Sequence, residues 1–160
     1  MAVDMFLKLE GIEGEAVDHK HAKEIDVLAW SWGMSQSGTT HTFEGSGAGK
    51  VNIQDISVTK WVDRSSPTIM QKISQGTHIP KATLVVRKAG DKPLEYLTIV
   101  MTDVIITSLS TGGSGGEDRL TENITLNFAH VHTIYKPQDK KGAGKADIEY
   151  KWNIATNESS

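Results

Sequence analysis

The segment that most constrains the fold is one long alternating stretch, residues 120–129, which follows directly on a glycine-rich loop. The loop contains Gly112, Gly113, Gly115 and Gly116. One side of the stretch is mostly apolar and carries Leu120, Glu122, Ile124, Leu126 and Phe128. The other side is polar or small and carries Thr121, Asn123, Thr125, Asn127 and Ala129. A period of two with one oily face predicts a half-buried β-strand whose polar side meets water or a partner.

Strand patterns dominate the rest of the chain as well. Residues 3–9, 25–34, 51–61, 83–88, 94–109 and 148–154 all have strand-like patterns, and the third changes parity near Gln54–Asp55, which predicts a bulge. One helix is expected over residues 66–75, with Ser66 as N-cap, Pro67 at its first position and Gly76 as its left-handed stop. About seven strands and one helix favour a barrel or a tight sandwich.

The 160 residues fit a single domain, 1–160, in which residues 155–160 are expected to form a loose tail. There are no cysteines, so neither disulfides nor a thiol nucleophile is available. A net charge of −3 without a basic stripe disfavours nucleic-acid binding. The N-terminus lacks the features of a signal peptide and no apolar run could span a bilayer, so we expect a protein made in the cytoplasm and not inserted in a membrane.

No motif supports catalysis or a cofactor. The segment Gly45–Lys50 departs from a phosphate-binding loop, because Glu44 replaces the first glycine and Val51 follows the lysine. His130 and His132 share a strand face, but a metal site needs further ligands, so surface or interface histidines are the simpler interpretation. For the carboxylates of Glu117, Asp118 and Glu122, the adjacent Arg119 is the immediate candidate partner. We therefore expect no enzyme, no cofactor and no metal.

The segment Ile25–Met34 divides its residues by size. Alternation places Leu28, Trp30, Trp32 and Met34 on one face and Val27, Ala29, Ser31, Gly33 and Ser35 on the other. The bulky face can anchor a core or a subunit interface, and the small face allows close approach of another molecule. Alternatively, exposed tryptophans would form the platform of a monomeric carbohydrate-binding barrel.

The sequence of these segments resembles that of the Hcp family, the haemolysin-coregulated tube proteins of bacterial type VI secretion. The likeness rests on Ser110–Ala129 and Ile25–Gly38, and is supported by Ala2–Lys8 and Ile148–Ile154. It implies a mainly β fold, a compact β-barrel of two antiparallel sheets with one flanking α-helix. It also implies that six copies form a ring and that rings stack into the inner tube of the apparatus. A tail-tube protein of a phage is the structural alternative.

The resemblance also implies partners and sites. The tube would lie inside a contractile sheath, end in a spike, carry small effector proteins in its lumen and leave the cell without a signal peptide. The expected lumen residues are Ala29, Ser31 and Gly33. The expected subunit boundary comprises Gly112, Gly113, Gly115, Gly116, Glu117, Asp118 and Arg119. Ring stacking is expected to involve Ser37, Gly38, Thr40, His41, Phe43 and Glu44, within the loop of residues 35–50.

Overall fold

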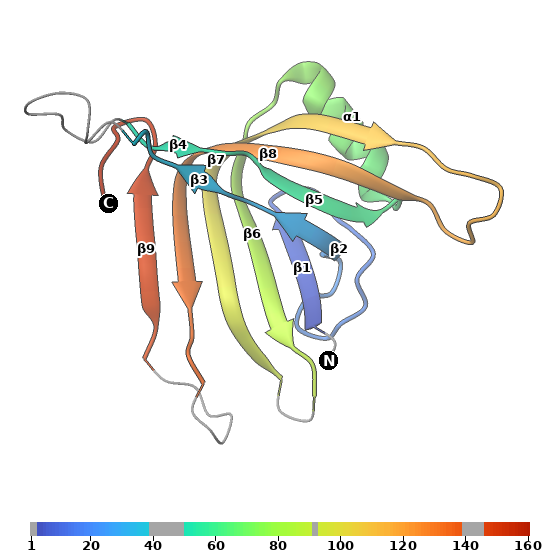
Figure 1. Cartoon of the computed structure of the whole chain (residues 1–160). Coiled ribbons are helices and arrows are strands. Elements are labelled where there is room, and N and C mark those ends of the chain that lie inside the picture. The colour runs from blue at the N-terminus through green and yellow to red at the C-terminus, as the bar shows by residue number, and fades with distance from the viewer. Residues whose placement is uncertain (1–2, 39–49, 91–92, 139–145) are drawn as a thin grey trace, which may run out of the picture.

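The computed structural model describes residues 3–38, 50–90, 93–138 and 146–160, which form nine strands and one helix (Figure 1). The first five strands are β1 (Val3–Leu9), β2 (Ile25–Ser31), β3 (Met34–Ser35), β4 (Asn52–Ile53) and β5 (Ile56–Trp61). Helix α1 (Ser65–Gln75) precedes β6 (Ile79–Lys88), β7 (Leu94–Thr111), β8 (Thr121–Tyr135) and β9 (Ile148–Asn153). Among the described residues no helix is long and apolar enough to cross a bilayer.

Six of the strands close into a barrel. The main sheet is antiparallel and runs in the order β5-β2-β1-β6-β7-β8-β9, and β5 also pairs with β8. That second pairing joins the two ends of the six-stranded part, while β9 extends the sheet beside the second half of β8. Strands β3 and β4 form a separate two-stranded sheet. The predicted barrel of antiparallel strands with one helix is confirmed.

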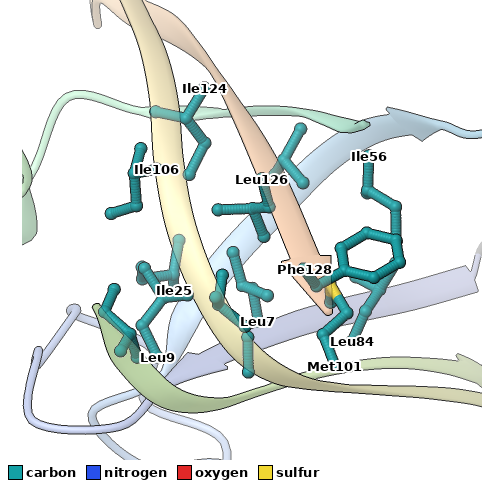
Figure 2. Packing of buried hydrophobic residues seen from close by; sticks show 14 of the residues in the cluster. Leu7, Leu9, Ile25, Ile56, Leu84, Met101, Ile106, Ile124, Leu126 and Phe128 are labelled. Carbon is teal, nitrogen blue, oxygen red and sulfur yellow. The ribbon is translucent and has the colours of Figure 1, made fainter. Parts of the chain in front are cut away.

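The core lies between the walls of this barrel, where the alternating side chains converge (Figure 2). On β8, the predicted face is confirmed from Glu122 to Phe128, because every second residue there is buried. Leu120 precedes the strand and is 41% exposed. Helix α1 contributes the fully buried Ile69 to the same cluster. Burial of about twenty apolar side chains is the main favourable contribution to folding.

The alternation predicted for residues 25–34 is interrupted twice. The β2–β5 register shifts at Leu28, so Val27 is buried in the core and Leu28 is 38% exposed, although strict alternation places Leu28 on the same face as Trp30 and Val27 on the same face as Ala29. The strand then ends at Ser31, and Met34 starts a new strand with β4 as its partner. Residues 51–61 are likewise divided at Gln54–Asp55, where a break between β4 and β5 replaces the predicted bulge.

Helix α1 begins one residue earlier than expected, and Ser66 is not its N-cap. Arg64 occupies the position before the helix and makes no side-chain cap. The carboxylate of Asp63 accepts a hydrogen bond from the Ser65 amide at 2.9 Å, and the Ser66 hydroxyl accepts one from the Asp63 amide at 3.1 Å. These two hydrogen bonds satisfy the Ser65 amide at the start of the helix and the Asp63 amide just before it. The predicted stop at Gly76 is confirmed, with φ 63°.

A buried ion pair lies at the place where β5 meets β8. Lys60 and Glu122 are directly opposite each other in the ladder, both side chains are fully buried, and Nζ lies 2.6 Å from Oε2. Lys60 also lies 3.1 Å from the carboxylate of Asp63, and Ser66 donates to Glu122 at 2.6 Å. The partner of Glu122 is therefore Lys60 and not Arg119. The pair joins the closing strands of the barrel to the start of α1.

The Lys60→Met substitution tests this pair. It leaves the Glu122 carboxylate buried without its countercharge, and we expect the free energy of unfolding to fall by about 3–5 kcal/mol in urea titrations. The double variant Lys60→Met/Glu122→Leu is the control. It should be more stable than the single variant, because the fully buried Glu122 carboxylate is gone and only Asp63 has lost its countercharge; equal stability would contradict the assignment.

The loop of residues 10–24 is clamped on the outside of the barrel. The His21 ring stacks on Phe6 with centroids 4.4 Å apart, and the Arg87 guanidinium lies 5.1 Å from the centre of the Phe6 ring. Arg87 also donates to Asp18 at 2.6 Å and to Asp4 at 3.1 Å. These hydrogen bonds from Arg87 hold the pKa of the Asp18 carboxyl well below its usual range.

The depressed pKa of Asp18 predicts a pH dependence. Because the unfolded carboxyl titrates near pH 4, its contribution to stability is complete above that pH and is lost as the pH falls further. Asp18→Asn should lower stability at pH 7 and flatten the decline between about pH 4 and pH 2 in urea titrations. Asp147→Asn is the matched control, since Asp147 lies 3.8 Å from Lys136 in an exposed pair, and it should change little. Identical pH profiles for both variants would contradict the prediction.

The C-terminal residues make a few contacts with the end of the sheet. Asn153 and Glu158 exchange backbone hydrogen bonds across a turn. The Ser159 hydroxyl donates to the Lys151 carbonyl at 3.4 Å, and Ser160 contacts His130. Residues 155–160 are all exposed, and their behaviour as a loose tail stays a prediction.

Candidate functional site

Four neighbouring strands present a continuous polar face on the outside of the barrel. The strands are β2, β5, the first half of β8 and the second half of β7 (Figure 1). Their register places small and polar residues in two cross-strand rows, Ala29–Thr59–Asn123–Ser110 and Ser31–Ser57–Thr125–Ser108. All eight residues are half-buried or exposed. The inward residues of the same strands form the core, so the two faces of this sheet have opposite character.

Side chains on this polar face hydrogen-bond to one another. Thr107 is the extra residue of a bulge in β7, and its hydroxyl and that of Ser108 each lie 2.6 Å from the Thr125 hydroxyl. Asp55 accepts hydrogen bonds from Thr107 at 2.7 Å and from Asn127 at 2.9 Å. A further bond of 2.6 Å joins Thr59 to Asn123. The hydroxyl and amide groups therefore hold each other in place.

The two polar rows contain no charged residue. Lys60 of β5 and Glu122 of β8 point into the barrel and neutralise each other. Asp55 lies at one end of the face, before β5, and Arg119 lies at the other end, 4.5 Å above the Trp61 ring. A face of this composition is wetted by water but exerts little electrostatic attraction on either sign of charge.

The sheet that carries this face has two open edges. Strand β1 pairs with β2 only at Ile25 and Asp26, so among the described residues β2 has no partner on that side over 28–31. Strand β6 pairs with β7 only as far as Val104, so within the described ranges residues 105–111 likewise have β8 on one side alone. Unpaired strand edges are templates for pairing with another chain. The two edges lie on opposite sides of the same four strands.

The structure places two of the three predicted lumen residues on the polar face. Ala29 and Ser31 are exposed members of its two rows. Gly33 lies beyond the end of β2, where its carbonyl accepts a hydrogen bond from the Gln54 amide at 3.0 Å. A Cβ on Gly33 would approach the Gln54 side chain at 3.1 Å. Gly33 therefore lies in the break between strands, away from the rows.

The glycine-rich segment links β7 to β8 and projects from the barrel (Figure 1). A Cβ on Gly113 would collide with the Leu120 side chain, whereas Gly112, Gly115 and Gly116 have open space around them. Glu117 and Asp118 are exposed, and Arg119 stacks on Trp61 of its own chain. Cross-pairing of these three charges between subunits stays a prediction.

The predicted stacking residues fall mostly outside the described part of the chain. Thr40, His41, Phe43 and Glu44 lie there, as does most of the Gly45–Lys50 segment. Ser37 and Gly38 are described and exposed after β3. Their role in stacking stays a prediction.

His132, Trp30 and Trp32 all make contacts within the described part of the chain. His132 lies 2.8 Å from Glu149, and no group of three or more potential metal ligands occurs within the described ranges. Trp30 and Trp32 pack against the core, as the bulky face predicted. The Trp32 indole donates to the Gln54 carbonyl at 2.9 Å and meets Phe128 edge to face at 6.1 Å. Packed in this way, the two rings do not form an open sugar platform.

Sequence reasoning missed half of the polar face. Ser57 and Thr59 on β5 and Ser108 and Ser110 on β7 complete the rows that contain Ala29, Ser31, Asn123 and Thr125. The alternation of polar Ser57 and Thr59 with their apolar neighbours was visible, but which strands would lie side by side was not. Cross-strand neighbours depend on register between distant segments.

Comparison with known proteins gives a consistent result. Residues 6–135 match the profile of the family described as "Type VI secretion system effector, Hcp". The chain is 57% identical over 159 residues to Protein hcp1 of Pseudomonas aeruginosa, and the match covers 98% of each sequence.

Solved structures agree with the sequence match. A structure described as a type six secretion system protein superposes with a TM-score of 0.91 at 32% identity and covers 99% of this chain and 100% of its own. Hcp1 from Salmonella typhimurium superposes with a TM-score of 0.82 at 38% identity, with both chains fully covered. Both similarities extend over the barrel, the helix and the polar face.

Proposed function

The chain belongs to the Hcp family of type VI secretion proteins, and we propose that it is a structural tube subunit that assembles head to tail into rings of six copies. The observation that carries this proposal is the polar four-stranded sheet with an open edge on each side. A subunit with two different, complementary edges forms heterologous contacts, which close into a ring when the rotation between copies permits.

The strand directions support the joining of these edges. The order β2, β5, β8, β7 is antiparallel at every step. In a ring where all copies have the same orientation, β7 of one copy therefore meets β2 of the next in antiparallel fashion. The sheet would continue around the ring without a break and without exposed edges, an arrangement that also protects against uncontrolled aggregation.

The polar face would then line the inside of the ring. Ala29 and Ser31 lie on it beside Ser57 and Thr125, and none of these side chains is large or charged. Such a lining accommodates a small effector protein through water and weak hydrogen bonds, without a charge that selects one cargo. Rings would stack through the segment that begins at Ser37 and Gly38 to form the tube, inside a sheath and behind a spike.

The proposed role is structural and not catalytic, and the assembled protein would be exported from the cell. The tube would leave through the type VI apparatus together with its cargo. Nothing in the packing of Trp30 and Trp32 favours the carbohydrate-binding alternative, since both rings lie against the core.

The oligomeric state tests the ring. Size-exclusion chromatography with light scattering on the purified chain should give a species of about six times 17.5 kDa, and negative-stain images should show an open ring. Association through repeated contacts makes the yield of rings depend on concentration, so the measurement should span a dilution series. A monomer that persists at every concentration would overturn the proposal.

A bulky substitution on the polar face tests the lumen. Ser31→Tyr adds volume at an exposed position, so the ring should persist while co-purification of a small effector with the ring falls. Val17→Tyr is the matched control, because Val17 is 95% exposed in the loop of residues 10–24, off the polar rows, and it should retain cargo. If Ser31→Tyr abolished the ring itself, Ser31 would be an interface residue and the assignment of the lumen would be wrong.

A further inference from the structure

Strands β1 and β2 separate soon after they meet and leave a slot in the barrel wall. Their ladder contains only the pairs Phe6–Asp26 and Leu7–Ile25. Beyond these pairs a cavity of about 220 Å³ opens between the strands, lined by Val3 and Met5 from β1, by Asp26 and Leu28 from β2 and by Trp61 from β5. The slot lies directly beside the open edge of β2.

The slot has the composition of an unfilled contact surface. Val3 is 42% exposed and Leu28 is 38% exposed, so two large apolar side chains stand at its rim. Asp26 is partly buried in it, and this burial raises the pKa of its carboxyl. Among the described residues, no side-chain hydrogen bond reaches that carboxylate. A partner that covered the apolar rim and donated a hydrogen bond to Asp26 would satisfy both groups.

Helix α1 presents a matching surface. Its inner side buries Ser65, Ser66 and Ile69. Its outer side is an exposed ridge made of Pro67, Met70, Gln71, Ser74 and Gln75. The ridge carries no charge in a chain of which 23% of the residues are charged, and Met70 at its centre is 42% exposed. Interface cores are depleted in charge and enriched in methionine, so this ridge has the character of a buried contact.

The slot and the ridge lie at opposite ends of the polar sheet. Helix α1 packs on β7. The helix starts near Glu122, to which Ser66 is hydrogen-bonded. It ends just before β6, and the start of β6 pairs with β7 at Val104. It therefore runs along residues 104–111, beside the open edge of β7 (Figure 1). The slot lies beside the open edge of β2. Joining the two edges brings the helix of one copy toward the slot of the next.

We propose that the ridge of α1, centred on Met70, seats in the slot between β1 and β2 of the adjacent copy, with Met70 against Val3 and Leu28. This inference rests on the head-to-tail ring proposed above and names the side chains that hold it together. The amides of Gln71 and Gln75 supply the donors that Asp26 lacks within the described part of its own chain. The sheet edges set the direction of assembly, and the helix in its slot supplies the apolar contact.

The natural absence of cysteine makes a direct test possible. The double variant Leu28→Cys/Met70→Cys, assembled and then treated with an oxidant or a short bis-maleimide linker, should form a ladder of covalent multimers on denaturing gels. Mixing the two single variants should give dimers only, because each contact joins position 28 of one copy to position 70 of another. The control pair Leu28→Cys/Val17→Cys should give no ladder, since Val17 lies on the clamped loop and not on the ridge.

A charge on the ridge gives an independent measurement. Met70→Asp should raise the concentration at which rings dissociate by at least about tenfold, as expected for a central apolar contact. Val17→Asp should leave that concentration unchanged. Both variants expose the altered side chain in the isolated chain, so both should fold.

The outcomes separate this inference from the ring itself. Rings of full size without cross-links between positions 28 and 70, and with Met70→Asp assembling normally, would overturn the helix-in-slot contact and leave the ring proposal standing. A wild-type chain that stays monomeric would overturn the ring and the contact together. Cross-links that match the predicted ladder, with weakened assembly of Met70→Asp, would support both.

Discussion

The buried pair of Lys60 and Glu122 is the interaction on which the architecture depends. It lies across β5 and β8, the two strands whose pairing turns an open sheet into a closed barrel. Through Asp63 and Ser66 it also fixes the place where helix α1 begins. Two buried charges are costly apart and acceptable only together, so the pair specifies one register for this seam. The open edges of β2 and β7 keep their positions because this seam between them is fixed.

Much of the fold could be predicted from local patterns. The alternation from Glu122 to Phe128 and the stop signal at Gly76 require only the nearest residues, and both are present in the structure as expected. Glu122 was visible as an acid on an apolar face, but local reasoning assigned it the neighbouring Arg119 as partner. Lys60, with the same parity as the apolar residues of β5, was the signal that could have identified the true one. It lies far away in the sequence, where local reasoning does not reach.

The remaining errors have a common physical origin. The shift at Leu28 adds one residue to β2, which exchanges the inner and outer faces beyond that point, and the break after Ser31 moves the chain into the separate β3–β4 sheet. The residue types do not predict these shifts, because the shifts accommodate the curvature of a closed barrel. The polar rows depend on the same information. Ala29 and Ser31 could be proposed from one strand, whereas their neighbours on β5, β8 and β7 emerge only once the strands are in register.

The hydroxyl groups of the polar face have a consequence for anything that moves across it. Thr107, Ser108 and Thr125 bond to each other, and Asp55 accepts from both Thr107 and Asn127, so these polar groups are already engaged with one another. If the face lines the ring as proposed, a polypeptide beside it would find no position that it strongly prefers over the next. Its interaction free energy would change little with position along the proposed channel, so the barriers to movement would be small. In the proposed ring, a lining of this kind would hold a cargo protein weakly and release it without a large barrier.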